Sequence, residues 1–218
     1  MEEEYFVEGK AHRYDFKTKP GVATPLDTHY PYKTRMIVRR PVNPEKFNGT
    51  VVIEWLNVSA KYDIDSDWWQ LYDYLMRSGY AWVEVSAQPA GVHSPQGLRN
   101  WNPARYGSLD VAVDTIDLEG PLRFDIFLQA VMALKGNPKV QPLGNLHPEF
   151  IIATGHSRSA WMLMRRPIEE ILDRLHRFHG FPNVQPDPLP LWIRSCHGSS
   201  QQMDQTTPVR HTHRNEYR

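Results

Sequence analysis

The sequence has few of the features that mark secreted, membrane-spanning or nucleic-acid-binding proteins. Its 218 residues contain one cysteine, Cys196, so an internal disulfide is excluded and nothing calls for an oxidising compartment. The 25 basic and 25 acidic residues balance, which leaves no overall charge to attract nucleic acid or an anionic membrane. No apolar run approaches the roughly 20 residues that span a bilayer. The acidic start is unlike a secretory signal, and we expect a cytoplasmic protein without nucleic-acid or membrane partners.

The residues that are present have the balance of a globular domain, with 40% hydrophobic and 23% charged residues. From about residue 32, strand-like and helix-like patterns alternate, which is typical of an α/β architecture. The strand patterns are at residues 35–40, 50–56, 80–85 and 149–154. We expect a mostly parallel sheet with flanking helices, in which the last three of these strands are neighbours at the centre.

Two amphipathic helices are predicted between these strands. The first begins at a cap among residues 65–67 and places on one face Trp68, Leu71, Tyr72 and Leu75. The second places on one face Phe124, Phe127, Leu128, Val131 and Leu134. Beyond residue 180 prolines and polar residues dominate. We therefore expect an α/β domain over residues 1–180 and a disordered tail over residues 181–218.

A short motif follows the fourth strand pattern, Gly-His-Ser-Arg-Ser at residues 155–159. An acyl-transfer nucleophile must project from the carboxyl end of a strand on a tight, strained turn. Small residues two before and two after it let the strand and the next helix approach closely. Gly155 and Ser159 occupy those positions around Ser157. The context favours a nucleophile elbow at Ser157; a surface turn without chemistry is the alternative.

A nucleophile elbow also needs backbone N–H groups that stabilise the oxyanion of the transition state. One comes from the residue after the nucleophile, here Arg158, and a second comes from the loop after an earlier strand. The loop after Trp55 has the right place in the chain order. Its candidate donors are the N–H groups of Asn57 and Val58, and the alternative is an ordinary strand-to-helix connection without this role.

Five segments stand in a distinctive order and spacing: EEYFV at 3–7, VIEWLNVS at 52–59, WNPARYG at 101–107, FDIF at 124–127 and GHS at 155–157. Together they resemble a family of serine hydrolase-like α/β-hydrolase-domain proteins. The resemblance covers about residues 3–160 and implies an α/β-hydrolase fold with Ser157 as the nucleophile. Arg158 stands where glutamine is expected in relatives, and the similarity ends after Ala160.

The acid and the base of a catalytic triad are harder to place. A serine is a weak nucleophile until a histidine takes its proton, and an acid must orient that histidine. In this fold both follow the serine, yet only 61 residues come after Ser157, so we expect a domain truncated after the elbow. The candidates are Asp187, in a proline-rich loop, and His197, after a last strand pattern at residues 191–193. The side chain of His156 is expected to point away from Ser157.

Three close pairs of residues could in principle bind a metal ion, namely His176 with His179, Cys196 with His197, and His211 with His213. Their spacing fits no structural zinc pattern, because such sites favour paired ligands on short rigid turns. Ordinary surface histidines account for them better. The sequence therefore predicts no metal and no cofactor.

The sequence predicts a serine hydrolase acting on a carboxylic ester or a related small acyl substrate, an assignment that rests on fold-level analogy. The alternative is a truncated, catalytically inactive hydrolase-like protein with at most a binding role, favoured by Pro167 within a helical pattern and by the polar tail. An elbow without a base retains only about 10³–10⁴-fold acceleration over water. We therefore expect little labelling of Ser157 by a fluorophosphonate.

Overall fold

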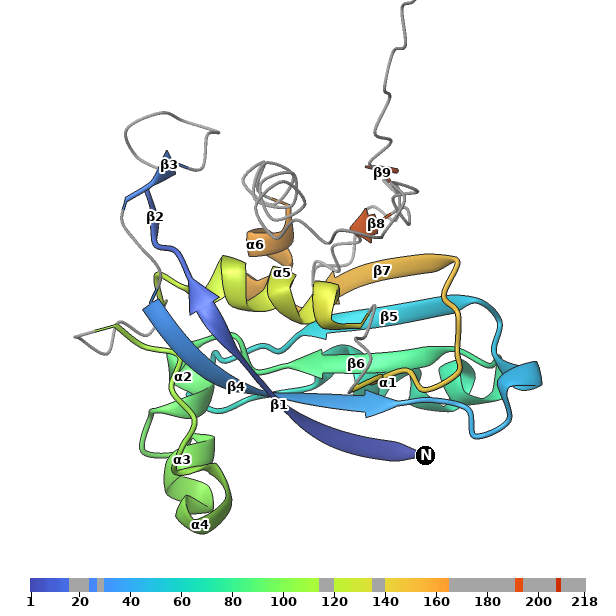
Figure 1. Cartoon of the computed structure of the whole chain (residues 1–218), viewed down its shortest axis with the longest axis horizontal. Coiled ribbons are helices and arrows are strands. Elements are labelled where there is room, and N and C mark those ends of the chain that lie inside the picture. The colour runs from blue at the N-terminus through green and yellow to red at the C-terminus, as the bar shows by residue number, and fades with distance from the viewer. Residues whose placement is uncertain are drawn as a thin grey trace, which may run out of the picture.

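A central sheet organises the structure, a computed structural model that describes residues 1–15, 24–26, 30–113, 120–134 and 140–164 and the backbone of 191–193 and 207–208. The strand order is β1-β4-β6-β5-β7-β8-β9 (Figure 1). The bounds are β1 Glu2–Ala11, β4 Tyr30–Arg39, β5 Thr50–Trp55, β6 Ala81–Val85, β7 Phe150–Gly155, β8 Leu191–Ile193 and β9 Thr207–Pro208. Two further strands, β2 (Tyr14–Asp15) and β3 (Thr24–Pro25), pair separately.

The middle of the sheet is parallel. β5 pairs with β6 on one side and with β7 on the other, and β7 pairs with β8, all in parallel register. β4, β1 and β9 are antiparallel additions toward the two edges. The prediction that residues 50–56, 80–85 and 149–154 form neighbouring central strands is confirmed, and with it the α/β fold class.

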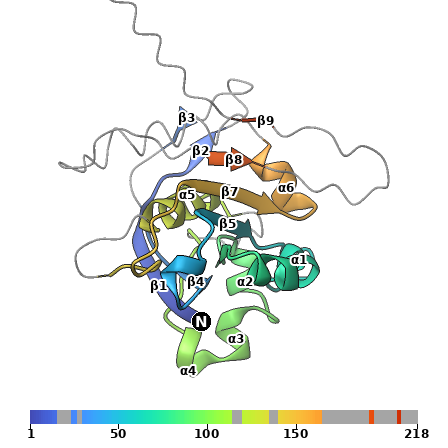
Figure 2. The ribbon, with the colours of Figure 1, turned by 90° about the vertical axis from the view of Figure 1, so that its right-hand side faces the viewer.

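Helices lie on both faces of the sheet. Their bounds are α1 Ser66–Arg77, α2 Pro89–Val92, α3 Leu98–Trp101, α4 Pro103–Tyr106, α5 Arg123–Ala133 and α6 Arg158–Leu163, with a 3₁₀ turn η1 at Pro44–Lys46. Seen along the sheet, α5 and α1 stand on opposite faces (Figure 2). In the part of the chain that the structure describes, no helix has the length and hydropathy to cross a membrane.

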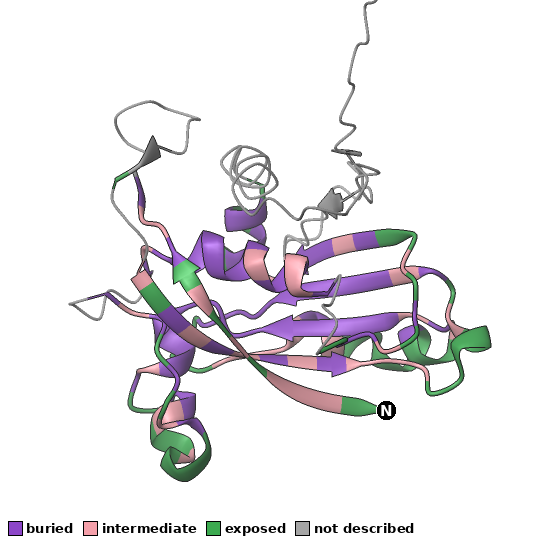
Figure 3. Ribbon diagram, in the orientation of Figure 1, coloured by how far each residue is buried: buried purple, intermediate pink, exposed green. Residues whose placement is uncertain are grey.

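The main core lies between the sheet and α5. Trp55 of β5 is fully buried, stacks on Phe127 at 4.7 Å between ring centroids and meets Phe124 edge-on at 5.5 Å. All five residues predicted for the buried face of α5 are buried. Because β5 and β6 are covered on both faces, they are buried along almost their whole length (Figure 3). This explains their near-continuous apolar sequence.

The opposite face carries a smaller apolar cluster under α1. Trp68 and Leu75 pack there against Val52 and Trp82. The predicted apolar face of α1 is wrong for Leu71 and Tyr72, whose side chains are 43% and 47% exposed. Within α1 the apolar contact with the sheet is thus made by Trp68 and Leu75.

Two regions were not predicted as regular structure. β1 is a ten-residue strand paired with β4 from Glu2 to Ala11, although it carries four glutamates. Its position near the sheet edge leaves alternate side chains in water, which is why charged residues fit there. The proline-rich connection after β6 contains the one-turn helices α2 and α4, each with proline in its first turn.

The core arrangement makes a prediction about stability. Phe127→Ala removes a fully buried ring stacked on Trp55, and we expect it to lower the free energy of unfolding by about 3–5 kcal/mol. Trp69→Ala, at a side chain 71% exposed, should change it by no more than about 0.5 kcal/mol. Urea denaturation measures both, and equal costs would contradict this placement of the core.

Candidate active site at the carboxyl end of β7

Ser157 stands two residues after the end of β7, in a strained backbone conformation. Its φ is +53° and its ψ is −112°, and it caps the amino end of α6. Side-chain-bearing residues rarely adopt such a conformation, which costs on the order of 1–3 kcal/mol. Among the described non-glycine residues, Lys61 alone shares a positive φ. The strained, exposed turn that a nucleophile elbow requires is therefore present at Ser157.

Close packing around Gly155 explains the small residues of the motif. A Cβ at position 155 would lie 3.0 Å from Ser159 Cβ and 3.2 Å from the backbone nitrogen of Ala160, tighter than most real Cβ contacts, so its neighbours would have to move by a few tenths of an ångström. Ser159 is buried in place of the usual second glycine, and its hydroxyl donates to the carbonyl oxygen of Leu56 at 3.0 Å. A serine is tolerated there because it is small and its polar group is satisfied.

The loop after β5 decides between the two predicted oxyanion donors. The N–H of Asn57 donates to the carbonyl of Ile64 at 3.1 Å, and the N–H of Ile64 donates back to Asn57 at 2.8 Å. The bridge to Ile64 therefore occupies the Asn57 N–H in this structure. No acceptor for Val58 N–H is found among the residues described, which favours Val58 over Asn57.

Side chains also hold this loop in place. The amide of Asn57 donates to the carbonyl oxygen of His156 at 2.9 Å, and its oxygen accepts the N–H of Ser59 at 2.8 Å. On the far side of the loop, the carboxylate of Asp63 is buried. It lies 3.3 Å from the guanidinium of Arg35 and accepts the hydroxyl of Ser86 at 2.5 Å. The loop is thus tied both to the elbow and to the sheet.

A polar layer lies between α1 and the sheet, at the level of the elbow. Glu54 is level with both Glu84 and Thr154 on the neighbouring strands. The Asp67 backbone N–H donates to Glu54 at 3.0 Å, and the Thr154 hydroxyl donates to the Asp67 carboxylate at 2.5 Å. The Nδ1 atom of His156 lies 3.7 Å from the same carboxylate. The His156 ring therefore lies toward α1.

Burial dominates the electrostatics of this layer. It raises the pKa of Glu54 to about 9, opposed by the hydrogen bond from Asp67 N–H and reinforced by the neighbouring carboxylates. Burial also raises the pKa of Glu84 to about 7, against the attraction of Arg39. Arg39 pairs with Glu84 and lies over the Trp68 ring at 4.2 Å. At neutral pH Glu54 is therefore protonated.

The proposed acid and base cannot be placed beside Ser157, since Asp187 and His197 lie outside the described residues, as do the three groups weighed for zinc. Within the described part of the chain, no group of three or more His, Cys, Asp and Glu side chains could hold a metal ion. His12 bonds to Asp125, and His93 accepts the N–H of Val111. Neither of these contacts involves the elbow.

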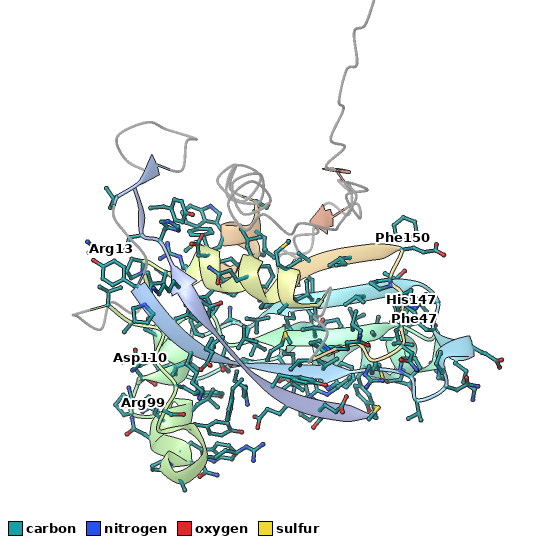
Figure 4. The ribbon with its side chains drawn as sticks, in the orientation of Figure 1. Arg13, Phe47, Arg99, Asp110, His147 and Phe150 are labelled. Atoms are coloured by element: carbon teal, nitrogen blue, oxygen red, sulfur yellow. The ribbon has the colours of Figure 1, made fainter. Side chains whose placement is uncertain are left out.

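A surface hollow lies at the other end of the sheet. Its lining includes Phe47, Gly49, His147 and Glu149, which precede β5 and β7 rather than follow them. Figure 4 shows Phe47, His147 and Phe150 at this end, away from Arg99 and Asp110. The hollow is therefore separate from the elbow.

Several residues of the site were missed by the sequence reading, namely Glu54, Asp63, Asp67, Glu84, Thr154 and the side-chain role of Asn57. One signal could have found three of them. Each of the three central strands has a polar residue next to its last position, Glu54, Glu84 and Thr154, in an otherwise apolar run. A buried polar residue must find partners, so such residues in adjacent parallel strands indicate a shared network.

The strain at Ser157 can be measured by comparing two substitutions. Ser157→Gly permits a positive φ, whereas Ser157→Ala keeps the steric penalty. We expect the glycine variant to be more stable than the alanine variant by about 1 kcal/mol, as measured by urea denaturation. At an ordinary turn with negative φ the order would be reversed, and that result would contradict the geometry.

The buried Glu54 predicts a pH dependence of stability. Its folded pKa of about 9 lies above its ordinary value of 4.5, so its contribution is full below pH 4.5 and is lost as the pH rises toward 9. The free energy of unfolding of Glu54→Gln, measured by urea denaturation, should match that of wild type near pH 5 and exceed it at pH 8–9. One such group changes the slope of the free energy of unfolding against pH by at most about 1.4 kcal/mol per pH unit. The exposed Glu45→Gln is the control, and parallel curves for Glu54→Gln and wild type would contradict the assignment.

Comparison with known proteins places the fold. A family model described as an alpha/beta hydrolase domain matches residues 1–182. The expected end of similarity after Ala160 is therefore wrong. No curated protein matches the chain.

Among solved structures, a brefeldin A esterase, a bacterial homologue of human hormone-sensitive lipase, is 13% identical over 81% of this chain and 36% of its own, with a TM-score of 0.35. A family 15 glucuronoyl esterase from Caldicellulosiruptor kristjansonii is 14% identical over 71% of this chain and 39% of its own, with a TM-score of 0.31. A glucuronoyl esterase from Solibacter usitatus is 11% identical over 94% of this chain and 70% of its own, with a TM-score of 0.32.

The chain thus spans 36% and 39% of the first two of these structures. Likenesses this low say nothing about substrate. The family match is different, because it covers most of the chain and agrees with the parallel central strands and their flanking helices. The chain belongs to the α/β-hydrolase domain family.

Proposed function

We propose that the chain carries the nucleophile of a serine hydrolase acting on a carboxylic ester or a related small acyl substrate, with Ser157 as that nucleophile. The observation that carries the proposal is the positive φ of Ser157 directly after a central parallel strand. A surface turn without chemistry has no need of this strain, and glycine would adopt the conformation at lower cost. Strain of this kind is common where a side chain must be presented for reaction.

The reaction follows from this geometry. Ser157 Oγ attacks the acyl carbon, and the carbonyl electron pair moves to the oxygen, where Val58 N–H and Arg158 N–H stabilise the negative charge. A histidine takes the serine proton and passes it to the departing alcohol, leaving an acyl-serine that water then hydrolyses. His197 is the proposed base and Asp187 the acid that orients it.

The alternative proposal is an inactive hydrolase-like protein with at most a binding role. The observation that favours it is that, among the described histidines, none has a recorded contact with Ser157; His156 lies toward Asp67 instead. The two proposals differ in one chemical property. Only an active enzyme has a base that raises the reactivity of Ser157 near neutral pH.

Fluorophosphonate labelling, followed by peptide mass spectrometry, tests both. For the active hydrolase we expect selective labelling of Ser157, lost in Ser157→Ala and kept in Ser108→Ala, a control at another exposed serine. Without a base the rate should rise about tenfold per pH unit, since only the alkoxide reacts. A histidine base would instead give a plateau above about pH 7.

The outcomes separate cleanly. A neutral-pH plateau that disappears in His197→Ala supports the active hydrolase and assigns its base. Selective labelling without a plateau supports an elbow that lacks its base, as in the inactive alternative. Labelling that persists in Ser157→Ala, or that spreads equally over exposed serines, would overturn Ser157 as the nucleophile.

A further inference from the structure

Asn57 is the residue whose side chain joins the β5–α1 loop to the elbow. It is buried, and its amide nitrogen donates to the carbonyl oxygen of His156, the residue immediately before Ser157. Its neighbour in the chain is Val58, the donor proposed for the oxyanion. One side chain therefore links the proposed oxyanion donor to the backbone of the proposed nucleophile.

Every polar group of Asn57 has a partner. Its backbone N–H and carbonyl bond to Ile64, its side-chain oxygen accepts the N–H of Ser59, and its side-chain nitrogen reaches His156. The amide offers an acceptor for the local turn and a donor for the elbow at two separate atoms of one short side chain. Aspartate keeps the acceptor and loses the donor, which makes the two functions separable.

The bond from Asn57 to His156 joins the β5–α1 loop to the elbow, and each of these is also held by other contacts. The loop is fixed from behind by the buried Asp63, which pairs with Arg35 and Ser86. The elbow helix is fixed to the end of β5 through the Ser159 hydroxyl on Leu56. Two backbone bonds also join Asn57 to Ile64, the neighbour of Asp63. Among the described residues, the bond from the Asn57 side chain to His156 is the hydrogen bond that links the turn of residues 57–59 directly to the elbow.

We propose that Asn57 is a positioning residue that aligns Val58 N–H with Ser157 and so forms the oxyanion hole. The inference rests on the proposed function, because it assigns a role within the same site. Asn57 acts through the backbone and does not itself touch substrate. Its loss should therefore slow acylation of Ser157 in a chain that remains folded.

Asn57→Asp is the sharpest test, because it replaces the donor with a second oxygen facing the His156 carbonyl and keeps the bond from Ser59. A matched control exists at the other end of β5. Asn48 also accepts an N–H two residues on, from Thr50 at 2.9 Å, and donates to a distant carbonyl, that of Ser78 at 2.8 Å. Asn48→Asp removes the same kind of bond at an exposed position away from the elbow.

We expect fluorophosphonate labelling of Ser157 to fall roughly 10- to 100-fold in Asn57→Asp and to stay within about twofold of wild type in Asn48→Asp. Protonation of the introduced carboxyl group restores a donor, so the deficit of Asn57→Asp relative to wild type should shrink as the pH is lowered. Equal labelling rates of Asn57→Asp and wild type at pH 8 would overturn the positioning role.

Two further measurements distinguish a loss of labelling caused by unfolding from one caused by misalignment of the site. Thermal melting checks that each variant is folded at the assay temperature, and Asn57→Ser, which also lacks a donor that reaches His156, replaces Asn57→Asp if the latter does not fold. If wild type is not labelled at Ser157, the proposed function fails. Amide hydrogen exchange then tests whether the bond from Asn57 to His156 holds the elbow in place. Faster exchange at Ser159 and Trp161 in Asn57→Asp but not in Asn48→Asp supports this role, and unchanged exchange overturns it.

Discussion

The close approach of β7 and α6 is the constraint on which the site depends. Gly155 and Ser159 pack so closely that a Cβ at position 155 would push its neighbours aside, and the chain turns from strand to helix within two residues. Ser157 takes the positive φ that this turn imposes. The strain persists because the surrounding structure over-determines it, through the bonds from Ser159 to Leu56 and from Asn57 to His156.

The two faces of the sheet support the elbow in different ways. Behind β5 and β7, α5 packs an apolar core around Trp55, which fixes the parallel strands and therefore the level of their carboxyl ends. On the α1 side the strands carry a polar layer at that level, and Asp67 connects it to Thr154, three residues before Ser157. A buried polar network is stable only when its members are satisfied. One oxygen of Glu54 is buried without a hydrogen-bond partner, and the raised pKa of this carboxyl group removes one negative charge from the layer at neutral pH.

The central strands could be predicted because both of their faces are covered, so that their sequences are apolar almost throughout. The elbow could be predicted because its requirement for small residues is local to the motif. Predictions that depended on long-range contacts were less successful. The bridge between Asn57 and Ile64 leaves no periodic signal, so the sequence could not show that Asn57 N–H is occupied. The exposure of Leu71 and Tyr72 depends on how α1 sits on the sheet, which the helical periodicity alone does not give.

The most direct test of the account is to trap the covalent intermediate. The chain is incubated with an activated acetate ester at high concentration, quenched in acid and digested, and the acetyl group is located by mass spectrometry. Because Ser157 stands on a strained, exposed turn and is the proposed nucleophile, we predict an acetyl group on Ser157 and none at that site in Ser157→Ala. Acetylation confined to lysines, or distributed over exposed serines with no preference for Ser157, would contradict it.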